Sequence, residues 1–207
     1  MSTREKILHT ALELINDKGY VHVGVREIAR ALKKSPGNIS YHFSKKEDIL
    51  IALLEQYRET NSALYEDYFA GQPSAHRFLE LMKGIFDSQF RYRGVFIGNQ
   101  FVKEEIQSGN RYDYRATYQQ RLSGFIRIFR ELRESKHLQV SDEDIEFLVA
   151  HIALVGRFWI YEATLFDKSP NQESTVKHYL DLLARQISLF ATPLGAQDLS
   201  EFRVSQE

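Results

Sequence analysis

The sequence contains no cysteine, which excludes disulfide bonds, thiolate metal sites and cysteine nucleophiles. It has only four prolines and eleven glycines, and segments that alternate between apolar and polar residues, as strands do, are hard to find. No uninterrupted apolar run approaches the roughly 18 residues that a membrane-spanning helix needs. With 207 residues, the chain can bury a substantial core as one large or two small domains. These features predict an all-α protein with no membrane partner.

Patterns typical of catalytic and metal sites are also missing. The sequence has no G-x-S-x-G, no P-loop and no G-x-G-x-x-G, and its seven histidines never occur as H-x-x-x-H or H-E-x-x-H. His151 is the only histidine that we expect to be buried, and a hydrogen-bonded core role is the simpler interpretation of it. We therefore predict no enzyme activity, no metal site and no cofactor.

The N-terminal segment does not have the pattern of a signal peptide. Residues 1–15 carry charges inside their apolar stretch. Ser2 and Glu5 have the spacing of a capping box, so the segment is expected to form the first helix. On these grounds we expect a cytoplasmic protein.

The most informative segment is residues 25–46, VREIARALKKSPGNISYHFSKK. Ile28, Ala29 and Leu32 lie on one face of a short helix, and two lysines follow in a polar turn. A second short helix comes directly after that turn, and two further lysines follow it. The segment therefore reads as two short helices joined by a basic turn.

The start and the face of the second helix can also be predicted. Ser35 followed by Pro36 is typical of a helix start, because serine caps a free backbone N–H and proline at the first helical position loses no hydrogen bond. Ile39 and Phe43 are the only obvious inward anchors, so the other side chains face outward. Two short helices joined by a turn, the second polar and flanked by lysines, predict a helix-turn-helix that binds DNA.

The same segment resembles the DNA-binding domain of the tetracycline-repressor (TetR/AcrR) family of bacterial transcription regulators. The family pattern is Ile-Ala, a turn, and then Ser-x-Gly-x-Ile/Leu-Tyr-x-His/Tyr-Phe-x-x-Lys-Glu-x-Leu/Ile. The residues that match it in register are Ile28, Ala29, Ser35, Gly37, Ile39, His42, Phe43, Lys46, Glu47 and Ile49. The sequence departs from the pattern where Ser40 replaces a tyrosine, although Tyr41 follows, and where Val23 and Gly24 replace two hydroxyl residues.

The helix-turn-helix predicts a set of DNA-binding residues. Basic and polar side chains are expected to bind phosphates and set the register, whereas Gly37, Asn38 and Ser40 are expected to approach base edges. The predicted partner is a double-stranded DNA operator. The DNA-binding residues that we predict are Arg26, Lys34, Ser35, Pro36, Gly37, Asn38, Ser40, Tyr41, His42 and Lys46.

Charge is unevenly distributed along the chain. Residues 1–46 contain nine Lys/Arg and four Asp/Glu, a balance of +5, whereas the other 161 residues hold 18 and 24, a balance of −6. Taken alone, such a split could be scattered surface charge on small helices. Because it coincides with the helix-turn-helix, it favours DNA binding by the N-terminal part.

Hydrophobic periodicity and cap signals predict about nine helices. Ser44 and Glu47 have the spacing of a capping box at the start of the fourth. After the first three, we expect helices over residues 46–70, 74–92, 94–106, 110–136, 141–166 and 169–192, followed by a polar, frayed end. We predict a helix-turn-helix DNA-binding domain at residues 1–46 and a helical effector-binding and dimerisation domain at residues 47–207.

The last two predicted helices carry more apolar surface than one side can bury. The helix at 141–166 has two apolar faces, and the sequence does not tell which one lines the pocket and which meets a partner. One face is formed by Ile145, Leu148, Val149, Ile152, Val155 and Trp159, and the other by Phe147, Leu154, Phe158, Tyr161 and Leu165. A helix that is apolar on both sides must be covered on both sides. A two-fold homodimer through a four-helix bundle would cover it, as the resemblance also implies, although a monomeric bundle with a deep core stays open. The predicted dimer contacts are Val155, Gly156, Leu182, Gln186 and Leu189.

Aromatic residues gather beyond the helix-turn-helix, where 23 of the 26 Phe, Tyr and Trp residues follow residue 46. Ligand pockets are lined mainly by apolar and aromatic side chains with a few polar groups. The resemblance implies a small-molecule effector site here, and the composition favours an apolar or aromatic effector, although an ordinary core is the simpler explanation of any single residue. The predicted ligand-binding residues are Phe86, Phe90, Phe96, Asn99, Gln100, Phe101, Tyr118, Phe125, Phe129, His151, Phe158 and Trp159.

Two classes of function remain. The first is a ligand-responsive transcriptional regulator, most simply a repressor that binds a palindromic operator as a dimer and is released by its effector. The alternative is an all-helical small-molecule-binding protein or enzyme whose N-terminal helices only cap the fold. A nucleoid-type DNA binder is a third idea, but it would not need the aromatic body. The register of the motif and the charge split favour the regulator.

Overall fold

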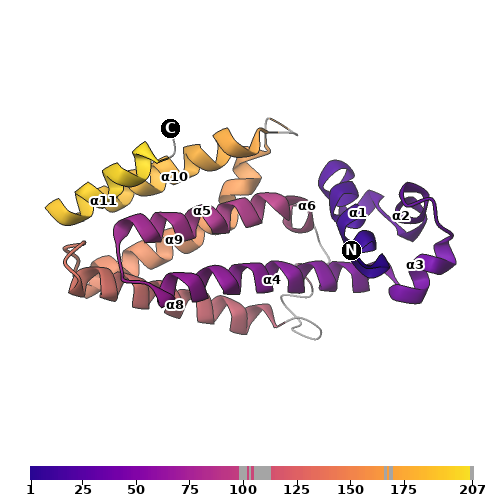
Figure 1. Ribbon diagram of the computed structural model, residues 1–207, viewed down its shortest axis with the longest axis horizontal. Coiled ribbons are helices and arrows are strands. Elements are labelled where there is room, and N and C mark those ends of the chain that lie inside the picture. Colours follow the sequence, from indigo (N-terminus) through magenta and orange to yellow (C-terminus); the bar gives the residue numbers. More distant parts are fainter. Residues whose placement is uncertain (98–101, 103, 105–112, 166, 168–169, 206–207) are drawn as a thin grey trace. The chain divides into compact units, whose positions relative to one another are not determined.

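The computed structural model describes residues 1–97, 102, 104, 113–165, 167 and 170–205. In this part of the chain all regular structure is helical, and an isolated bridge between Leu138 and Ala191 is the only strand-like pairing. The all-α prediction is therefore confirmed, with ten α-helices where about nine were expected (Figure 1). No described helix is long and apolar enough to cross a bilayer.

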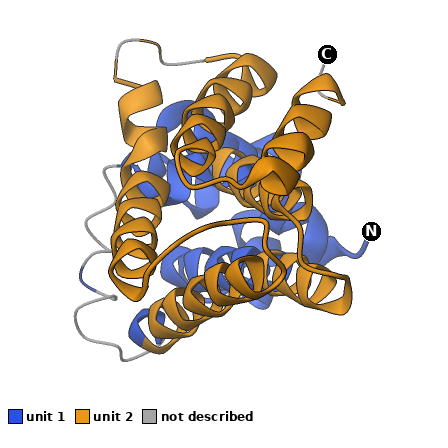
Figure 2. Ribbon diagram, turned by 90° about the vertical axis from the view of Figure 1, so that its left-hand side faces the viewer, with its two compact units in different colours: residues 1–60, 91–115 blue, residues 61–90, 116–207 orange. Residues whose placement is uncertain are grey.

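The chain divides into two compact units, which Figure 2 shows in different colours. Unit 1 comprises residues 1–60 and 91–115, and unit 2 comprises residues 61–90 and 116–207. The predicted boundary at residue 46 concerns functional domains and is not tested by this division, which places residues 47–60 and 91–115 with the N-terminal helices. The long helix α4 (Lys46–Ala70) contributes to both units without interruption.

Unit 1 is built from short helices around one apolar core. Besides the first part of α4, its elements are α1 (Thr3–Lys18), the 3-10 turn η1 (Tyr20–His22), α2 (Val25–Ala31), α3 (Pro36–His42) and α6 (Arg93–Phe96). The predicted capping box of the first helix is present, since Ser2 and Glu5 each accept the other's backbone N–H. The core side chains come from every one of these helices and include Ile7, Ile28, Ile39, Leu50 and Val95.

Helix α6 belongs to unit 1 because it docks on the end of α1. The side-chain amide of Asn16 donates to the Arg91 carbonyl at 2.8 Å and accepts the Gly94 N–H at 2.9 Å. A Cβ at Gly94 would lie 2.5 Å from the Ile15 carbonyl oxygen, so only glycine allows this approach. The predicted helix over 94–106 is wrong at its start, because α6 ends at Phe96 and the Ile97 backbone is extended. Most of residues 98–106 lie outside the described residues.

The predicted cap of α4 at Ser44 is wrong by one residue. The helix begins at Lys46, and the backbone N–H of Lys45 donates to the Asp48 carboxylate at 3.1 Å. Asp48 therefore takes the role that the spacing assigned to Glu47. A carboxylate one residue later reaches the flanking N–H equally well, because both acids lie in the first turn.

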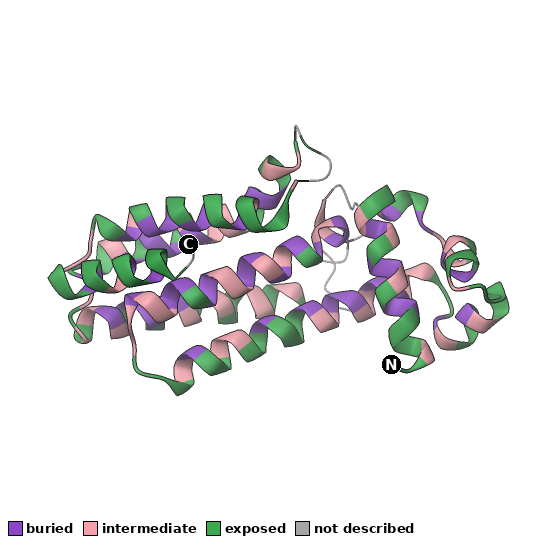
Figure 3. Ribbon diagram, turned by 45° about the horizontal axis from the view of Figure 1, so that its top comes forward, coloured by how far each residue is buried: buried purple, intermediate pink, exposed green. Residues whose placement is uncertain are grey.

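Unit 2 is a bundle of longer helices. It contains the second part of α4, α5 (Ala75–Arg91) without its last residue, and α8 (Tyr114–Glu134) without its first two residues. Three further helices lie wholly within it: α9 (Asp142–Ala163), α10 (Gln172–Ser188) and α11 (Pro193–Val204). Buried residues follow the inner sides of its helices and exposed residues the outer sides (Figure 3). Phe78 of α5 contacts Phe129 of α8 at a ring-centroid distance of 5.4 Å, and both rings are fully buried. Each such ring stabilises the fold by about 1.5–3 kcal/mol.

The polar C-terminal end expected from the sequence is instead the helix α11. Thr192 caps it and Pro193 occupies its first turn, the same signal as at Ser35 and Pro36. Leu199 and Phe202 bury one side of the helix. The prediction was wrong because the many polar residues hid a buried pair at helical spacing. The preceding helix is capped by Asn171 rather than by Ser169, which lies outside the described residues.

Candidate DNA-binding interface

The turn between α2 and α3 is fixed by backbone hydrogen bonds at the end of α2. Lys33 N–H donates to the Arg30 carbonyl at 3.1 Å, and Lys34 N–H donates to the Ala29 carbonyl at 2.9 Å. This pair of bonds is a Schellman motif, and it places Lys33 in the left-handed region, with φ of 54°. An L-residue with a Cβ is disfavoured there by about 1–2 kcal/mol.

Helix α3 begins immediately after this turn. The Ser35 hydroxyl accepts the Asn38 N–H at 3.2 Å, and Pro36 occupies the first helical position, so the predicted start is confirmed. Ile39 is the one residue of α3 that is buried, and Phe43, which ends the helix, is the second anchor. A helix held by two apolar side chains leaves the rest of its surface available.

The residues predicted to bind DNA are mostly exposed. Those classed as exposed are Arg26, Lys34, Ser35, Pro36, Gly37, Ser40 and Tyr41, and those of intermediate exposure are Asn38, His42 and Lys46. Tyr41 is 86% exposed, and its ring meets the edge of His42 at a centroid distance of 5.2 Å. Most of the residues predicted to bind DNA therefore lie on α3 or directly before it.

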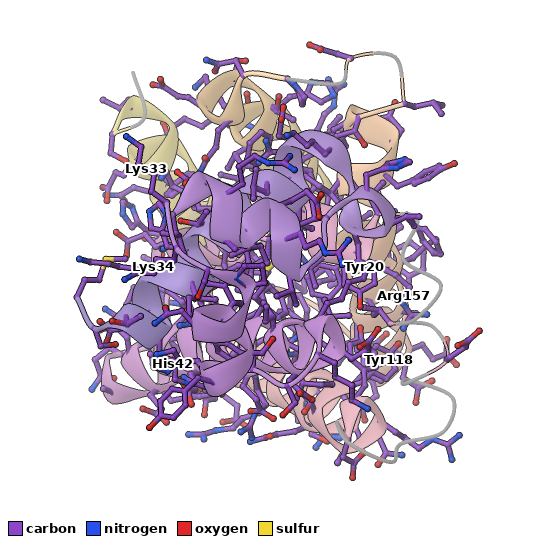
Figure 4. The ribbon with its side chains drawn as sticks, turned by 90° about the vertical axis from the view of Figure 1, so that its right-hand side faces the viewer. Tyr20, Lys33, Lys34, His42, Tyr118 and Arg157 are labelled. Atoms are coloured by element: carbon purple, nitrogen blue, oxygen red, sulfur yellow. The ribbon has the colours of Figure 1, made fainter. Side chains whose placement is uncertain are left out.

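Lysines in the turn have no partner within the described protein. No ion pair or hydrogen bond engages the side chains of Lys33 and Lys34 in the described residues, and both are exposed. Lys33, Lys34 and His42 lie along one side of the view in Figure 4, with Tyr20 toward the other. Unpaired ammonium groups beside a helix start are suited to binding phosphate.

Lys46 differs from these lysines because it is held by the protein. Its ammonium group donates to the Tyr20 carbonyl at 2.9 Å and lies 4.1 Å from the centre of the Tyr20 ring. Lys46 therefore joins the start of α4 to η1. No local sequence pattern predicts this contact, since 26 residues separate the two partners.

Asn38 is also less available than its sequence position suggests. Its side-chain oxygen is buried and has no hydrogen-bond partner in the described residues. A base-reading amide would need that oxygen at the surface. Gly37 and Ser40, both exposed, are the better placed of the three residues predicted to approach bases.

The predicted ligand-binding residues do not all come together. Asn99, Gln100 and Phe101 lie outside the described residues. Phe96 belongs to unit 1, where its ring contacts Tyr57 at 4.9 Å. The predicted ligand-binding residues that belong to unit 2 are Phe86, Phe90, Tyr118, Phe125, Phe129, His151, Phe158 and Trp159.

Trp159 lies at the centre of the aromatic residues in unit 2. Its ring is 4.9 Å from Phe86 and 5.0 Å from Tyr179, and its indole N–H donates to the Gln89 side-chain oxygen. The Gln89 amide nitrogen in turn donates to the Gly156 carbonyl at 2.7 Å. Gln89 was not predicted, because nothing in its sequence environment distinguishes it from a surface glutamine.

A groove of about 480 Å³ lies between α9 and α10. Its lining includes three residues predicted to bind the ligand, His151, Phe158 and Trp159. It also includes three residues predicted to form the dimer interface, Val155, Leu182 and Gln186. His151 Nδ1 lies 2.7 Å from the Gln186 side-chain oxygen, which agrees with the hydrogen-bonded role expected for it. The same groove is lined by Leu154, Glu162, Tyr179 and Leu183.

The second apolar face of α9 is exposed. Four of its residues on α9, together with Leu165 after the helix, Leu182 on α10 and Leu189 at the C-cap of α10, are more than half exposed; the four on α9 are Phe147, Leu154, Phe158 and Tyr161. A continuous apolar surface of this kind marks an interaction site in most proteins. Gly156 is not required by packing in the described part of the protomer, because a Cβ there would meet no atom within 4 Å.

Two family profiles match the chain. Residues 7–53 match the profile described as bacterial regulatory proteins, tetR family, and residues 56–202 match the one described as bacterial transcriptional repressor. Together they cover the helix-turn-helix and nearly all of the helical body.

Named relatives of this chain are regulators. It is 25% identical over 202 residues to IcaR, the negative transcriptional regulator of the biofilm operon icaADBC in Staphylococcus aureus (strain Newman), covering 90% of this chain and 98% of IcaR. It is 28% identical over 115 residues to the probable transcriptional regulator YttP of Bacillus subtilis, covering 50% of this chain. The chain spans only 56% of YttP and 35% of TcmR of Streptomyces glaucescens, to which it is 31% identical over 84 residues.

Solved structures share the whole fold. A TetR-family transcriptional regulator from Marinobacter aquaeolei VT8 superposes with a TM-score of 0.84 over 100% of both chains, at 24% identity. The ketosteroid transcriptional regulator KstR2 of Mycobacterium tuberculosis gives a TM-score of 0.72 over 92% of this chain and 96% of KstR2, at 17% identity. At these identities the likeness concerns the fold.

Proposed function

We propose that this chain, which belongs to the tetR family of bacterial regulatory proteins, represses transcription as a homodimer on a palindromic operator. Members of this family are DNA-binding transcriptional regulators and not enzymes, and this chain is one of them. The proposal extends to a small apolar or aromatic effector that releases the DNA. Each part rests on a different surface of the molecule.

The DNA-binding part rests on α3 and its flanking lysines. Only Ile39 and Phe43 anchor this helix, so its polar side can enter a major groove without loss of core packing. Lys34 and the other exposed basic residues bind phosphates and set the register. Gly37 and Ser40 approach base edges, where the absence or small size of a side chain permits close contact.

The dimer rests on the exposed apolar face of α9 and α10. Leu154, Phe158 and Leu182 line the groove between these helices, and Leu189, the C-cap residue of α10, is 79% exposed. A two-fold partner that lays the same face on this one would bury all of these side chains, and it would match a palindromic operator. The predicted contacts Val155, Leu182, Gln186 and Leu189 belong to this face or its groove, whereas Gly156 is joined to Gln89 on the inner side.

The effector site is proposed among the aromatic side chains of unit 2. Phe86, Trp159 and Tyr179 form a chain of ring contacts, and Gln89 supplies a polar group beside them. Because α4 continues from the DNA-binding helices into unit 2, a ligand that shifts this helix changes the separation of the two recognition helices. Those helices must be about 34–36 Å apart to enter successive major grooves, so a ligand that prefers another separation lowers DNA affinity.

The observation that carries the proposal is the exposed, lysine-flanked recognition helix in the register of the family. The test is selection of bound duplexes from a random DNA pool by the full-length protein at low salt. A palindromic consensus with two half-sites is the expected result. Recovery of sequences without any common motif would contradict the proposal and favour a binder without sequence preference.

A further inference from the structure

Lys33 occupies a backbone position that is better suited to glycine. Its φ of 54° lies in the left-handed region, and its N–H makes the bond to Arg30 that closes the Schellman motif of α2. Helices usually end on glycine at this position because glycine has no Cβ to clash there. The side chain of Lys33 is therefore retained against a local conformational preference.

Nothing within the described protein accounts for that side chain. Lys33 is exposed, and none of the hydrogen bonds or ion pairs of the described residues involves its ammonium group. By contrast, the ammonium of Lys46 is held by Tyr20, and the guanidinium of Arg4 lies 5.0 Å from the centre of the Phe43 ring. Lys33 thus has a strained backbone, and its charge stabilises no contact within the described part of the free protomer.

We propose that Lys33 is a DNA-phosphate contact of the helix-turn-helix, a role that the motif residues do not include. Lys33 lies two residues before the Ser35 cap of α3 and next to Lys34. Its ammonium group therefore reaches the DNA phosphate backbone beside the major groove that α3 enters. A flexible ammonium is a point charge suited to phosphate and not to paired reading of a base edge. This inference rests on the proposed DNA binding and adds a contact to it.

The chain contains a matched control at Lys136. At the end of α8, Lys136 N–H donates to the Arg133 carbonyl and His137 N–H donates to the Leu132 carbonyl, which is the same motif. Lys136 has φ of 62° and is exposed, but it belongs to unit 2, outside the helix-turn-helix. Lys136→Gly removes the same charge and relieves the same backbone strain as Lys33→Gly.

The experiment compares Lys33→Gly, Lys33→Arg and Lys136→Gly in the full chain. The probe is a duplex selected by the wild-type protein, with affinity measured between about 50 and 200 mM salt. Loss of one phosphate contact in each half-site should make the slope of log K against log salt shallower by about two units and lower affinity on the order of tenfold to a hundredfold near 0.1 M salt. This loss is expected for Lys33→Gly alone, while Lys33→Arg keeps wild-type affinity within a few-fold.

Thermal unfolding separates this role from a structural one. Both glycine variants should unfold at the wild-type temperature or a few degrees above it, because each gains a more favourable backbone. Wild-type slope and affinity in Lys33→Gly, or an equal loss in Lys136→Gly, would overturn the inference while leaving the proposed function intact. Absence of DNA binding by the wild-type protein at low salt would overturn both.

Discussion

The ammonium group of Lys46 lies 4.1 Å from the centre of the Tyr20 ring and donates a hydrogen bond to the Tyr20 carbonyl oxygen at 2.9 Å. A residue of the family motif is therefore also a clamp between α4 and η1 inside unit 1. Substitution of Lys46 is therefore expected to loosen the packing of α4 on η1 as well as to weaken the proposed DNA binding.

Lys46→Ala should lower both stability and DNA affinity. The cation–π contact contributes about 0.5–1 kcal/mol and the hydrogen bond about 0.5–1.5 kcal/mol, so the free energy of unfolding should fall by about 1–2.5 kcal/mol. Lys34→Ala is the matched control, because its side chain has no partner in the described protein and only DNA affinity should fall. Urea unfolding and salt-dependent gel shifts measure the two effects. Equal stabilities of the two variants would refute the clamp.

Gly37→Ala should weaken operator binding without harming the fold. A Cβ at Gly37 would lie 3.9 Å from the Ser35 hydroxyl oxygen, which is ordinary contact, and alanine favours the helix by up to about 1 kcal/mol. The added methyl group stands where we propose that the backbone of α3 approaches the bases, so affinity for the selected duplex should fall. Gly124→Ala on α8, with its Cβ 3.5 Å from Tyr65, is the control that should keep full affinity. Unchanged binding by Gly37→Ala would show that the α3 backbone at Gly37 does not approach the DNA bases closely.

Leu154→Arg should prevent dimerisation. Leu154 lines the α9–α10 groove and is more than half exposed, so arginine is tolerated in the free protomer but places an unpaired charge in the proposed seam. Sedimentation velocity should show a monomer at micromolar concentration, with operator affinity strongly reduced although every DNA-contacting residue is intact. Val21→Arg, which changes an exposed apolar residue of unit 1, should stay dimeric. A Leu154→Arg protein that remains a dimer would exclude this face as the interface.

Asp144 should make the stability of the chain depend on acid pH. The pKa of this carboxyl lies below its ordinary value of 3.8, because the backbone N–H and the hydroxyl of Ser141 donate to its ionised form. Ionised Asp144 therefore stabilises the folded chain above the pKa of the unfolded state, and this contribution is lost as pH falls through the lowered pKa.

The measurement is carboxyl titration by NMR in the wild-type protein and in Ser141→Ala. Removal of the hydroxyl should raise the pKa of Asp144 toward 3.8, with the remaining shift due to the backbone N–H. Asp142, whose pKa is lowered by Arg133, is the internal control and should not move. Identical Asp144 titrations in the two proteins would show that the Ser141 hydroxyl does not donate to this carboxylate.

Much of unit 1 could be predicted because its signals are local. The Ser2 and Ser35 caps, Pro36 and the anchors Ile39 and Phe43 are all read from residues within a few positions of one another. The Lys46 contact with Tyr20 and the burial of the Asn38 oxygen could not be predicted, because both depend on how distant segments pack.

The helical body was predictable only in part for the same reason. The periodicity of α9 revealed two apolar faces, but it could not show that Trp159 would turn inward to Gln89 while Leu154 and Phe158 remained exposed. The start of α11 at Thr192 and Pro193 carried a readable cap signal that its polar composition obscured.

We propose that two copies of this chain bind a two-fold DNA site through α3. The most direct test is the stoichiometry and spacing of the complex with a selected duplex, measured by sedimentation at several protein concentrations. We expect dimers bound to duplexes whose half-sites are one helical turn, about 34–36 Å, apart, with affinity falling sharply when five base pairs are inserted between them. Tight binding of a single copy, or affinity that does not respond to the inserted half turn, would contradict it.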